Sequence, residues 1–109
     1  MASTLVLVRD LMFASKISAT AKAGGIEIEM LRDPATLSDR IGRRLIVDLN
    51  QPGAIEAAGA WKAGEQGRQV VGFVSHTDAQ TIARARSAGI DQVMARSQFV
   101  ASIDALLRE

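Results

Sequence analysis

Short apolar runs alternate with segments of helical periodicity along the whole chain. Three of these runs, residues 5–8, 45–47 and 70–74, are three to five residues long and contain no charged side chain. Short, wholly apolar runs are typical of strands that are covered on both faces, as in a parallel sheet. The pattern therefore predicts three buried strands in the interior of one sheet.

Two weaker strands are predicted at residues 26–30 and 91–95. The first alternates apolar residues with glutamates, which implies one wet face. We therefore expect the strand at residues 26–30 to lie at an edge of the sheet.

The segments between the strands carry apolar residues at helical spacing. The expected helices cover residues 13–21, 34–41, 55–63, 78–89 and 99–107. Asp33 is predicted to cap the second helix, with Leu37 and Ile41 facing inward and Gly42 ending it. Thr77 and Gln80 fit a capping box at the start of the fourth helix.

This alternation predicts an α/β fold with a doubly wound, five-stranded parallel sheet and helices on both faces. With the 26–30 strand at one edge, the natural strand order is 2-1-3-4-5, a flavodoxin-like architecture. Its 109 residues suit one domain. We expect residues 1–109 to form that single domain, with no output domain.

Composition narrows the functional classes. The chain has no cysteine and a net charge of +1, so thiolate metal sites are excluded and there is no electrostatic case for nucleic acid. No run approaches the roughly 20 apolar residues of a membrane span, and the N-terminus lacks the basic start of a signal peptide. These features predict a cytoplasmic protein without a membrane partner.

Polar residues follow the predicted strands at their carboxyl ends. They are Asp10, Asp48, Ser75 and Arg96. In the order 2-1-3-4-5, the first and third strands are neighbours, so Asp10 and Asp48 should meet at the crevice where such sheets bind ligands. The sequence thus predicts a site built from two carboxylates, a hydroxyl and a guanidinium.

The segment Asp48-Leu49-Asn50-Gln51-Pro52 is similar to the D-x-N-x-P motif of bacterial response-regulator receiver domains. This resemblance covers essentially the whole chain and implies that Asp48 is the phosphoacceptor. It also implies Mg²⁺ ligation by Asp10, Asp48 and the backbone carbonyl of Asn50. Ser75 matches the hydroxyl residue that binds the phosphoryl oxygens.

Several positions depart from the receiver pattern. Arg9 replaces the first of two adjacent acids, Arg96 replaces a lysine, Ser97 replaces the following proline, and Val93 replaces an aromatic residue. The charges of Asp10, Asp48, Arg9 and Arg96 sum to zero, whereas the usual site is strongly negative. The resemblance is therefore to an atypical or degenerate receiver.

The orientation of Arg9 decides how far a metal site is weakened. An inward guanidinium about 5 Å from Mg²⁺ would repel it by several kcal/mol at an effective dielectric of about 20. Arg9 could instead bind Asp48 in bidentate fashion, or point outward and leave some affinity. We expect Mg²⁺ to bind weakly or not at all.

Three hypotheses follow. The first is a stand-alone pseudo-receiver of a two-component or phosphorelay type system, acting through a protein partner at a surface formed by the 78–89 and 99–107 helices. The second is a working response regulator, phosphorylated on Asp48 with Mg²⁺ and aided by Ser75 and Arg96. Partners would be a histidine kinase, a phosphotransfer protein or a downstream target, and a homodimer is left open.

The third hypothesis is a small flavodoxin-like ligand-binding protein or enzyme. Residues 11–13 are apolar where a flavodoxin needs a hydroxyl-rich loop, and no glycine-rich phosphate loop is present. We therefore expect no enzymatic activity beyond self-phosphorylation and dephosphorylation at Asp48.

Overall fold

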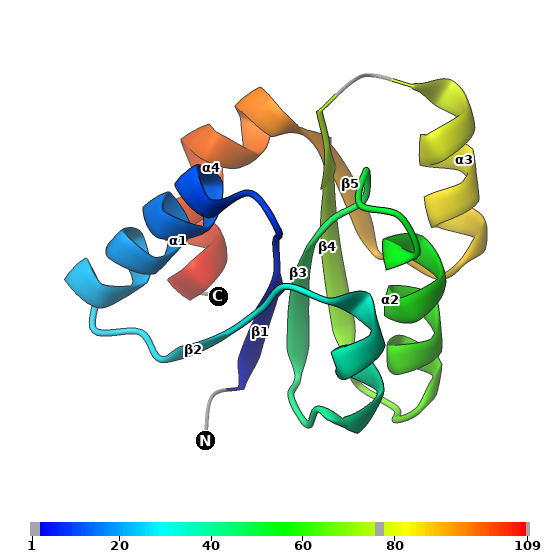
Figure 1. Ribbon diagram of the computed structural model, residues 1–109, viewed down its shortest axis with the longest axis horizontal. Helices are drawn as coiled ribbons and strands as arrows, with labels where there is room; N and C mark the ends of the chain where they lie inside the picture. The colour runs from blue at the N-terminus through cyan, green and yellow to red at the C-terminus, as the bar shows by residue number, and fades with distance from the viewer. Residues whose placement is uncertain (1–2, 76–77, 109) are drawn as a thin grey trace.

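The chain folds into one parallel sheet with helices on both faces (Figure 1). The structure, a computed structural model, describes residues 3–75 and 78–108. In chain order the elements are β1 (Thr4–Leu7), α1 (Leu11–Ala23), β2 (Ile28–Leu31), the 3₁₀ helix η1 (Pro34–Asp39), β3 (Arg44–Asp48), α2 (Ala54–Ala63), β4 (Gln69–Val74), α3 (Ala79–Ser87), β5 (Gln92–Ala95) and α4 (Arg96–Arg108).

The five strands run parallel in the order β2-β1-β3-β4-β5, which confirms the predicted topology. The register pairs Leu7 of β1 with Val47 of β3, so these two strands end at the same edge. The loops that follow β1 and β3 therefore meet at the carboxyl edge of the sheet. β2 lies at the edge of the sheet with half-buried residues, as its alternating pattern predicted.

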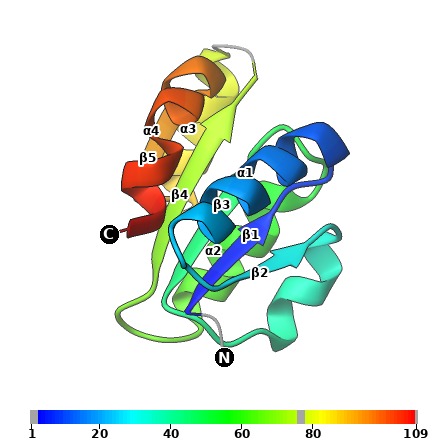
Figure 2. The same ribbon diagram turned by 90° about the vertical axis from the view of Figure 1, so that its left-hand side faces the viewer.

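Each face of the sheet buries its own apolar cluster. Helices α1 and α4 cover one face, and η1, α2 and α3 cover the other (Figures 1 and 2). On the first face the rings of Phe13, Phe73 and Phe99 stack, with centroids 4.9 Å apart for Phe13 and Phe73 and 4.4 Å apart for Phe73 and Phe99. Fully burying one such side chain contributes about 1.5–3 kcal/mol.

Two predictions about the second helix are wrong. The segment is a 3₁₀ helix that ends at Asp39, before Gly42, and Ile41 is 64% exposed although it was expected to face inward. The helix stops at Asp39 and Arg40 is already extended, so Ile41 lies beyond the helix and helical spacing no longer places it on the same face as the buried Leu37. The predicted cap at Asp33 is confirmed, since its Oδ1 accepts the Ala35 N–H at 2.9 Å.

The last two helices begin differently from the prediction. Asp78 caps α3 by accepting the Gln80 N–H at 3.0 Å, so the cap is Asp78 and the predicted cap, Thr77, lies outside the described residues. α4 begins at Arg96, directly after β5 and three residues before the predicted Phe99. Within the described part of the chain, no helix has the length and apolarity to cross a membrane.

Candidate functional site at the carboxyl edge

Asp48 ends β3 and lies half-buried in the carboxyl edge of the sheet. Its Oδ1 accepts the Asn50 N–H at 3.0 Å, which fixes the turn that follows. Burial raises the pKa of Asp48, while the Asn50 hydrogen bond and the Arg96 charge lower this pKa and the Asp10 charge raises it. Asp10, Arg96 and Asp48 therefore interact electrostatically at one place, as the strand order predicted.

Asn50 joins the two central loops of this edge. Its Oδ1 accepts the backbone N–H of Ser75 at 2.5 Å, and the Leu49 N–H donates to the Phe73 carbonyl at 3.0 Å. The Asn50 side chain is thus engaged with the loop after β4. Ser75 is exposed at that loop, and His76 lies outside the described residues.

Asp10 is the N-cap of α1. Its Oδ1 accepts the N–H groups of Met12 at 2.9 Å and Phe13 at 3.2 Å. The Phe13 hydrogen bond is the largest influence on the pKa of Asp10, which lies below its usual value. A carboxylate in this position satisfies helix N–H groups that otherwise lack partners.

Arg96 is the first residue of α4 and contacts Asp10 on the face of the sheet that α1 and α4 share. Its Nη2 lies 3.4 Å from Oδ2 of Asp10, and its guanidinium stands 4.5 Å from the centroid of the Phe13 ring. Cation–π attraction to the Phe13 ring and the charge of the Asp10 carboxylate both hold the guanidinium in place. Both carboxylate oxygens of Asp10 are therefore engaged.

Arg9 points elsewhere. It lines a recess with Arg32, Asp33, Pro34, Gln51 and Pro52, on the β2 side of this edge. No ion pair joins Arg9 to Asp48 among the residues that the structure describes. The bidentate contact between Arg9 and Asp48 is therefore not observed.

The acidic residues of this edge already have partners within the protein. Mg²⁺ prefers near-octahedral oxygen ligands. Arg9 stands where the receiver resemblance expects the first of two adjacent acids. Asp10 accepts hydrogen bonds from two backbone N–H groups and pairs with the Arg96 guanidinium. Within residues 3–75 and 78–108, no group of three or more histidine, cysteine, aspartate or glutamate side chains is placed to hold a metal.

Sequence reasoning missed two residues of this edge. Gln51 is only 7% exposed, and its Nε2 donates to the Arg32 carbonyl at 2.6 Å, which ties the loop after β3 to the loop after β2. Phe13 was expected only as a core residue, yet its ring also supports Arg96. Polarity predicts an exposed glutamine, so only the loop packing shows the role of Gln51.

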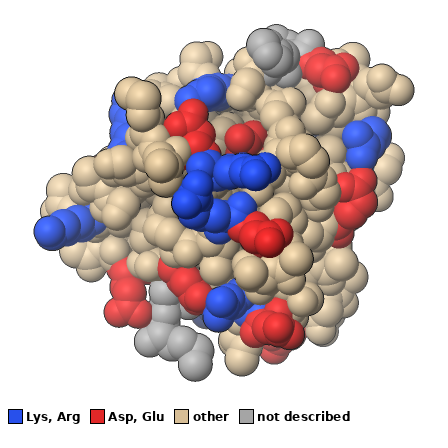
Figure 3. All heavy atoms as spheres, in the orientation of Figure 1, with Lys and Arg blue, Asp and Glu red and all other residues tan. Residues whose placement is uncertain are grey.

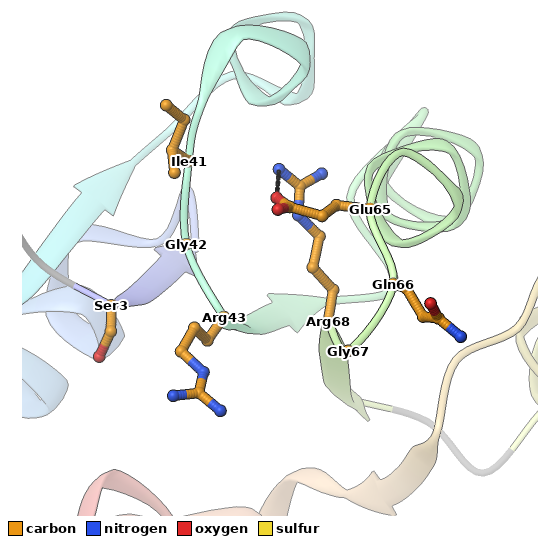
Figure 4. Close-up of a pocket in the computed structure, with 8 residues that line it drawn as sticks. All are labelled: Ser3, Ile41, Gly42, Arg43, Glu65, Gln66, Gly67 and Arg68. Carbon is orange, nitrogen blue, oxygen red and sulfur yellow. Dashed lines mark ion pairs between the residues drawn. The ribbon is translucent and has the colours of Figure 1, made fainter.

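A second recess lies at the opposite, amino end of the sheet (Figure 4). It is about 430 Å³ in volume, and none of the residues predicted for the site lines it. On one side Arg68 donates to the Trp61 carbonyl at 2.6 Å, pairs with Glu65 at 3.3 Å and stacks 4.4 Å from the Trp61 ring centroid. Because its guanidinium is engaged inside the protein, Arg68 holds the loop between α2 and β4 in place.

The remaining two departures from the receiver pattern, Val93 and Ser97, lie in β5 and at the start of α4. Val93 is partly buried and packs against the cluster under α2 and α3. On α3, Arg84 pairs with Glu56 of α2 at 2.6 Å, and Arg86 is exposed.

No family model matches the sequence, and no curated protein matches it. Solved structures do match. A response regulator from Burkholderia pseudomallei, whose structure holds a phosphorylated aspartic acid, a calcium ion and citrate, is 16% identical with a TM-score of 0.79; the match covers 98% of this chain and 66% of that one. The chain therefore spans just under two thirds of that protein.

Two further structures match over nearly their full length. The chemotaxis response regulator CheY4 of Vibrio cholerae is 16% identical with a TM-score of 0.79, covering 99% of this chain and 97% of that one. A de novo designed Rossmann 2x3 protein is 19% identical with a TM-score of 0.78, covering 99% and 90%. At these identities the matches establish architecture alone, and the chain has the flavodoxin-like fold of response-regulator receiver domains.

Proposed function

We propose that this chain is an atypical receiver-type signalling module that acts through contact with a protein partner, without accepting a phosphoryl group on Asp48. The observation that carries this proposal is the position of Arg96, whose guanidinium contacts Asp10 at 3.4 Å over the Phe13 ring. A resident cation at Asp10 competes directly with any divalent ion.

Electrostatics supports the same conclusion. A receiver site concentrates carboxylates so that their charge holds a metal, which then stabilises phosphoryl transfer. Here two arginines follow strands at the edge that carries the two aspartates, and one of them is already paired with Asp10. Little net negative charge is left to attract Mg²⁺.

The start of α1 supports a protein partner. Leu11 is 65% exposed and Met12 is 85% exposed, directly after Asp10. Large apolar side chains that lie together on a surface are characteristic of protein interaction sites. We place the partner contact at this first turn of α1, in addition to the α3 and α4 surface suggested by the sequence.

A working phosphoacceptor is the second candidate. The half-buried Asp48 stands at the carboxyl end of β3, and no described cation forms an ion pair with it. In that case Asp48 would attack the phosphorus of a phosphoryl donor, form an acyl phosphate and release the donor's leaving group.

Incubation with acetyl phosphate and Mg²⁺, followed by intact mass spectrometry, separates the two candidates. We expect no adduct on the wild type. An adduct of one phosphoryl group on the wild type that is lost in Asp48→Ala would contradict the proposal and establish the phosphoacceptor.

A double variant, Arg9→Asp with Arg96→Lys, restores the acid and the lysine that the receiver resemblance implies. We expect this variant to acquire the adduct, because the metal then finds the missing carboxylate and loses the guanidinium. Arg86→Asp is the matched control, since Arg86 is an exposed arginine on α3, outside the site. It should remain unmodified.

A further inference from the structure

A polar recess of about 390 Å³ lies beside the Asp48 loop, at the same edge of the sheet. Three loops form it: Arg9 comes from the loop after β1, Arg32, Asp33 and Pro34 follow β2, and Gln51 and Pro52 follow β3. Its volume falls within the range of small-molecule sites. The crevice beyond the carboxyl ends of parallel strands is where open α/β sheets bind ligands.

Arg9 and Arg32 are brought together by strand pairing. Leu7 of β1 pairs with Leu31 of β2, and the Val8 N–H donates to the Leu31 carbonyl at 3.1 Å. Arg9 and Arg32 follow directly, so two guanidiniums line one recess from adjacent strands. Among the described residues, neither arginine forms an ion pair with a carboxylate.

Several other arginines of the chain are paired with carboxylates. Arg40 lies 3.4 Å from Glu29, Arg84 lies 2.6 Å from Glu56, and Arg96 is held by Asp10. Figure 3 shows basic side chains gathered near the middle of one face, with acidic side chains close to them. The recess is thus a place where positive charge exceeds what nearby carboxylates neutralise.

The acidic groups near the recess are already engaged. Oδ1 of Asp33 accepts the Ala35 N–H at 2.9 Å, and Asp10 binds Arg96 and two backbone N–H groups. Asp48 is half-buried under its own turn and accepts the Asn50 N–H. With two arginines and one aspartate, the lining carries a net positive charge.

Gln51 adds an unsatisfied acceptor. Its side chain is buried, and its Nε2 donates to the Arg32 carbonyl, but its Oε1 has no donor among the described residues. A buried acceptor without a donor is costly, because its interaction with water has been lost without replacement. A ligand that supplies a donor at this point would recover that loss.

We propose that this recess binds a small organic oxyanion, a carboxylate or a phosphate, that also carries a hydroxyl or N–H group. The guanidiniums of Arg9 and Arg32 bind the anionic group, for which their planar fork is well suited. Gln51 accepts a hydrogen bond from the ligand's donor, and Pro34 and Pro52 contact its carbon atoms. This assignment is independent of the signalling role proposed above.

Titration of the full chain followed by ¹H–¹⁵N NMR tests the assignment. The probes are 3-hydroxybenzoate and glycerol 3-phosphate, each of which combines an oxyanion with a hydroxyl group. We expect saturable shifts at the amides of Arg9, Arg32 and Gln51 with at least one probe in the millimolar range. The probe that binds more tightly identifies the anion class.

Variants assign the binding to the two arginines. Arg9→Gln and Arg32→Gln should each weaken binding about tenfold, since each removes a charge-assisted hydrogen bond. Arg86→Gln, which removes an exposed arginine elsewhere, should leave binding unchanged. Because Arg9 and Arg32 are exposed, their variants should unfold at the wild-type temperature, which verifies that any loss is local.

Three results would overturn the proposal. One is the absence of saturable binding by either probe, and another is saturable binding that shifts amides away from the recess. The third is equal weakening by Arg86→Gln and Arg9→Gln, which would indicate a general attraction of anions to the basic surface.

Discussion

Gly72 of β4 allows the loop that carries Asp48 and Asn50 to pack against the sheet. A Cβ atom at Gly72 would stand 2.5 Å from Cδ1 and 2.7 Å from Cγ of Leu49, inside contact distance. Leu49 is 3% exposed, and its N–H is bonded to the Phe73 carbonyl, so it has little room to move. Gly72→Ala should therefore destabilise the protein and displace the loop.

The magnitude follows from two opposing effects. Forcing one methyl group into a packed core costs about 1–3 kcal/mol, and replacing glycine by alanine recovers about 0.4–1 kcal/mol of chain entropy. The net loss is about 1–2 kcal/mol in the free energy of unfolding. For a domain of this size, each kcal/mol corresponds to roughly 4 °C in Tm.

Urea unfolding followed by the fluorescence of Trp61, which is 3% exposed in α2, measures the loss. We expect a lower midpoint with an unchanged m-value. A double-mutant cycle with Leu49→Ala identifies the contact. Leu49→Ala alone should cost about 2–5 kcal/mol, but it removes the atoms that the new methyl group meets.

In the Leu49→Ala background, Gly72→Ala should therefore cost nothing or be slightly stabilising. If Gly72→Ala costs the same in both backgrounds, the close approach to Leu49 is not the cause and the argument is refuted.

Three other predictions use the same unfolding assay. Burial raises the pKa of Asp48, so folding favours its protonated form. The free energy of unfolding should therefore fall as the pH rises from the unfolded-state pKa of about 3.9 through the folded-state pKa. Asp48→Asn should raise Tm at pH 7 and lose this gain in acid. Asp10→Ala should lower Tm at pH 7, since α1 loses its cap and Arg96 loses its partner. The difference in Tm between wild type and variant should shrink as the pH falls through the folded-state pKa of Asp10, which is lowered. Gly59→Ala should lower the free energy of unfolding by about 1–2 kcal/mol, because the new Cβ would stand 2.8 Å from the Ala88 carbonyl oxygen. This loss is expected even though alanine is the better helix former by about 1 kcal/mol. An unchanged urea midpoint would show that α2 and α3 separate freely.

The interior strands were predictable because they are fully buried. Residues 5–7, 45–47 and 70–74 lie in β1, β3 and β4, and a strand covered on both faces must be apolar throughout. Strand order followed from the half-polar pattern of β2, which suits an edge. The error at Ile41 arose because the helix ends at Asp39, two residues earlier than the pattern predicted, and the extended backbone at Arg40 leaves Ile41 off the helical face.

The chain's order of residues determined the α/β class, the strand order and the meeting of Asp10, Asp48, Ser75 and Arg96 at one edge, because parallel strands deliver their carboxyl ends to the same side. Tertiary structure alone decided what those side chains do there. The Asp10 carboxylate and the Phe13 ring both belong to the start of α1. They hold Arg96, which is 86 residues further along the chain than Asp10. Arg9 lines a recess together with Arg32 and does not pair with Asp48, because its position depends on the packing of three loops, which no spacing along the chain specifies.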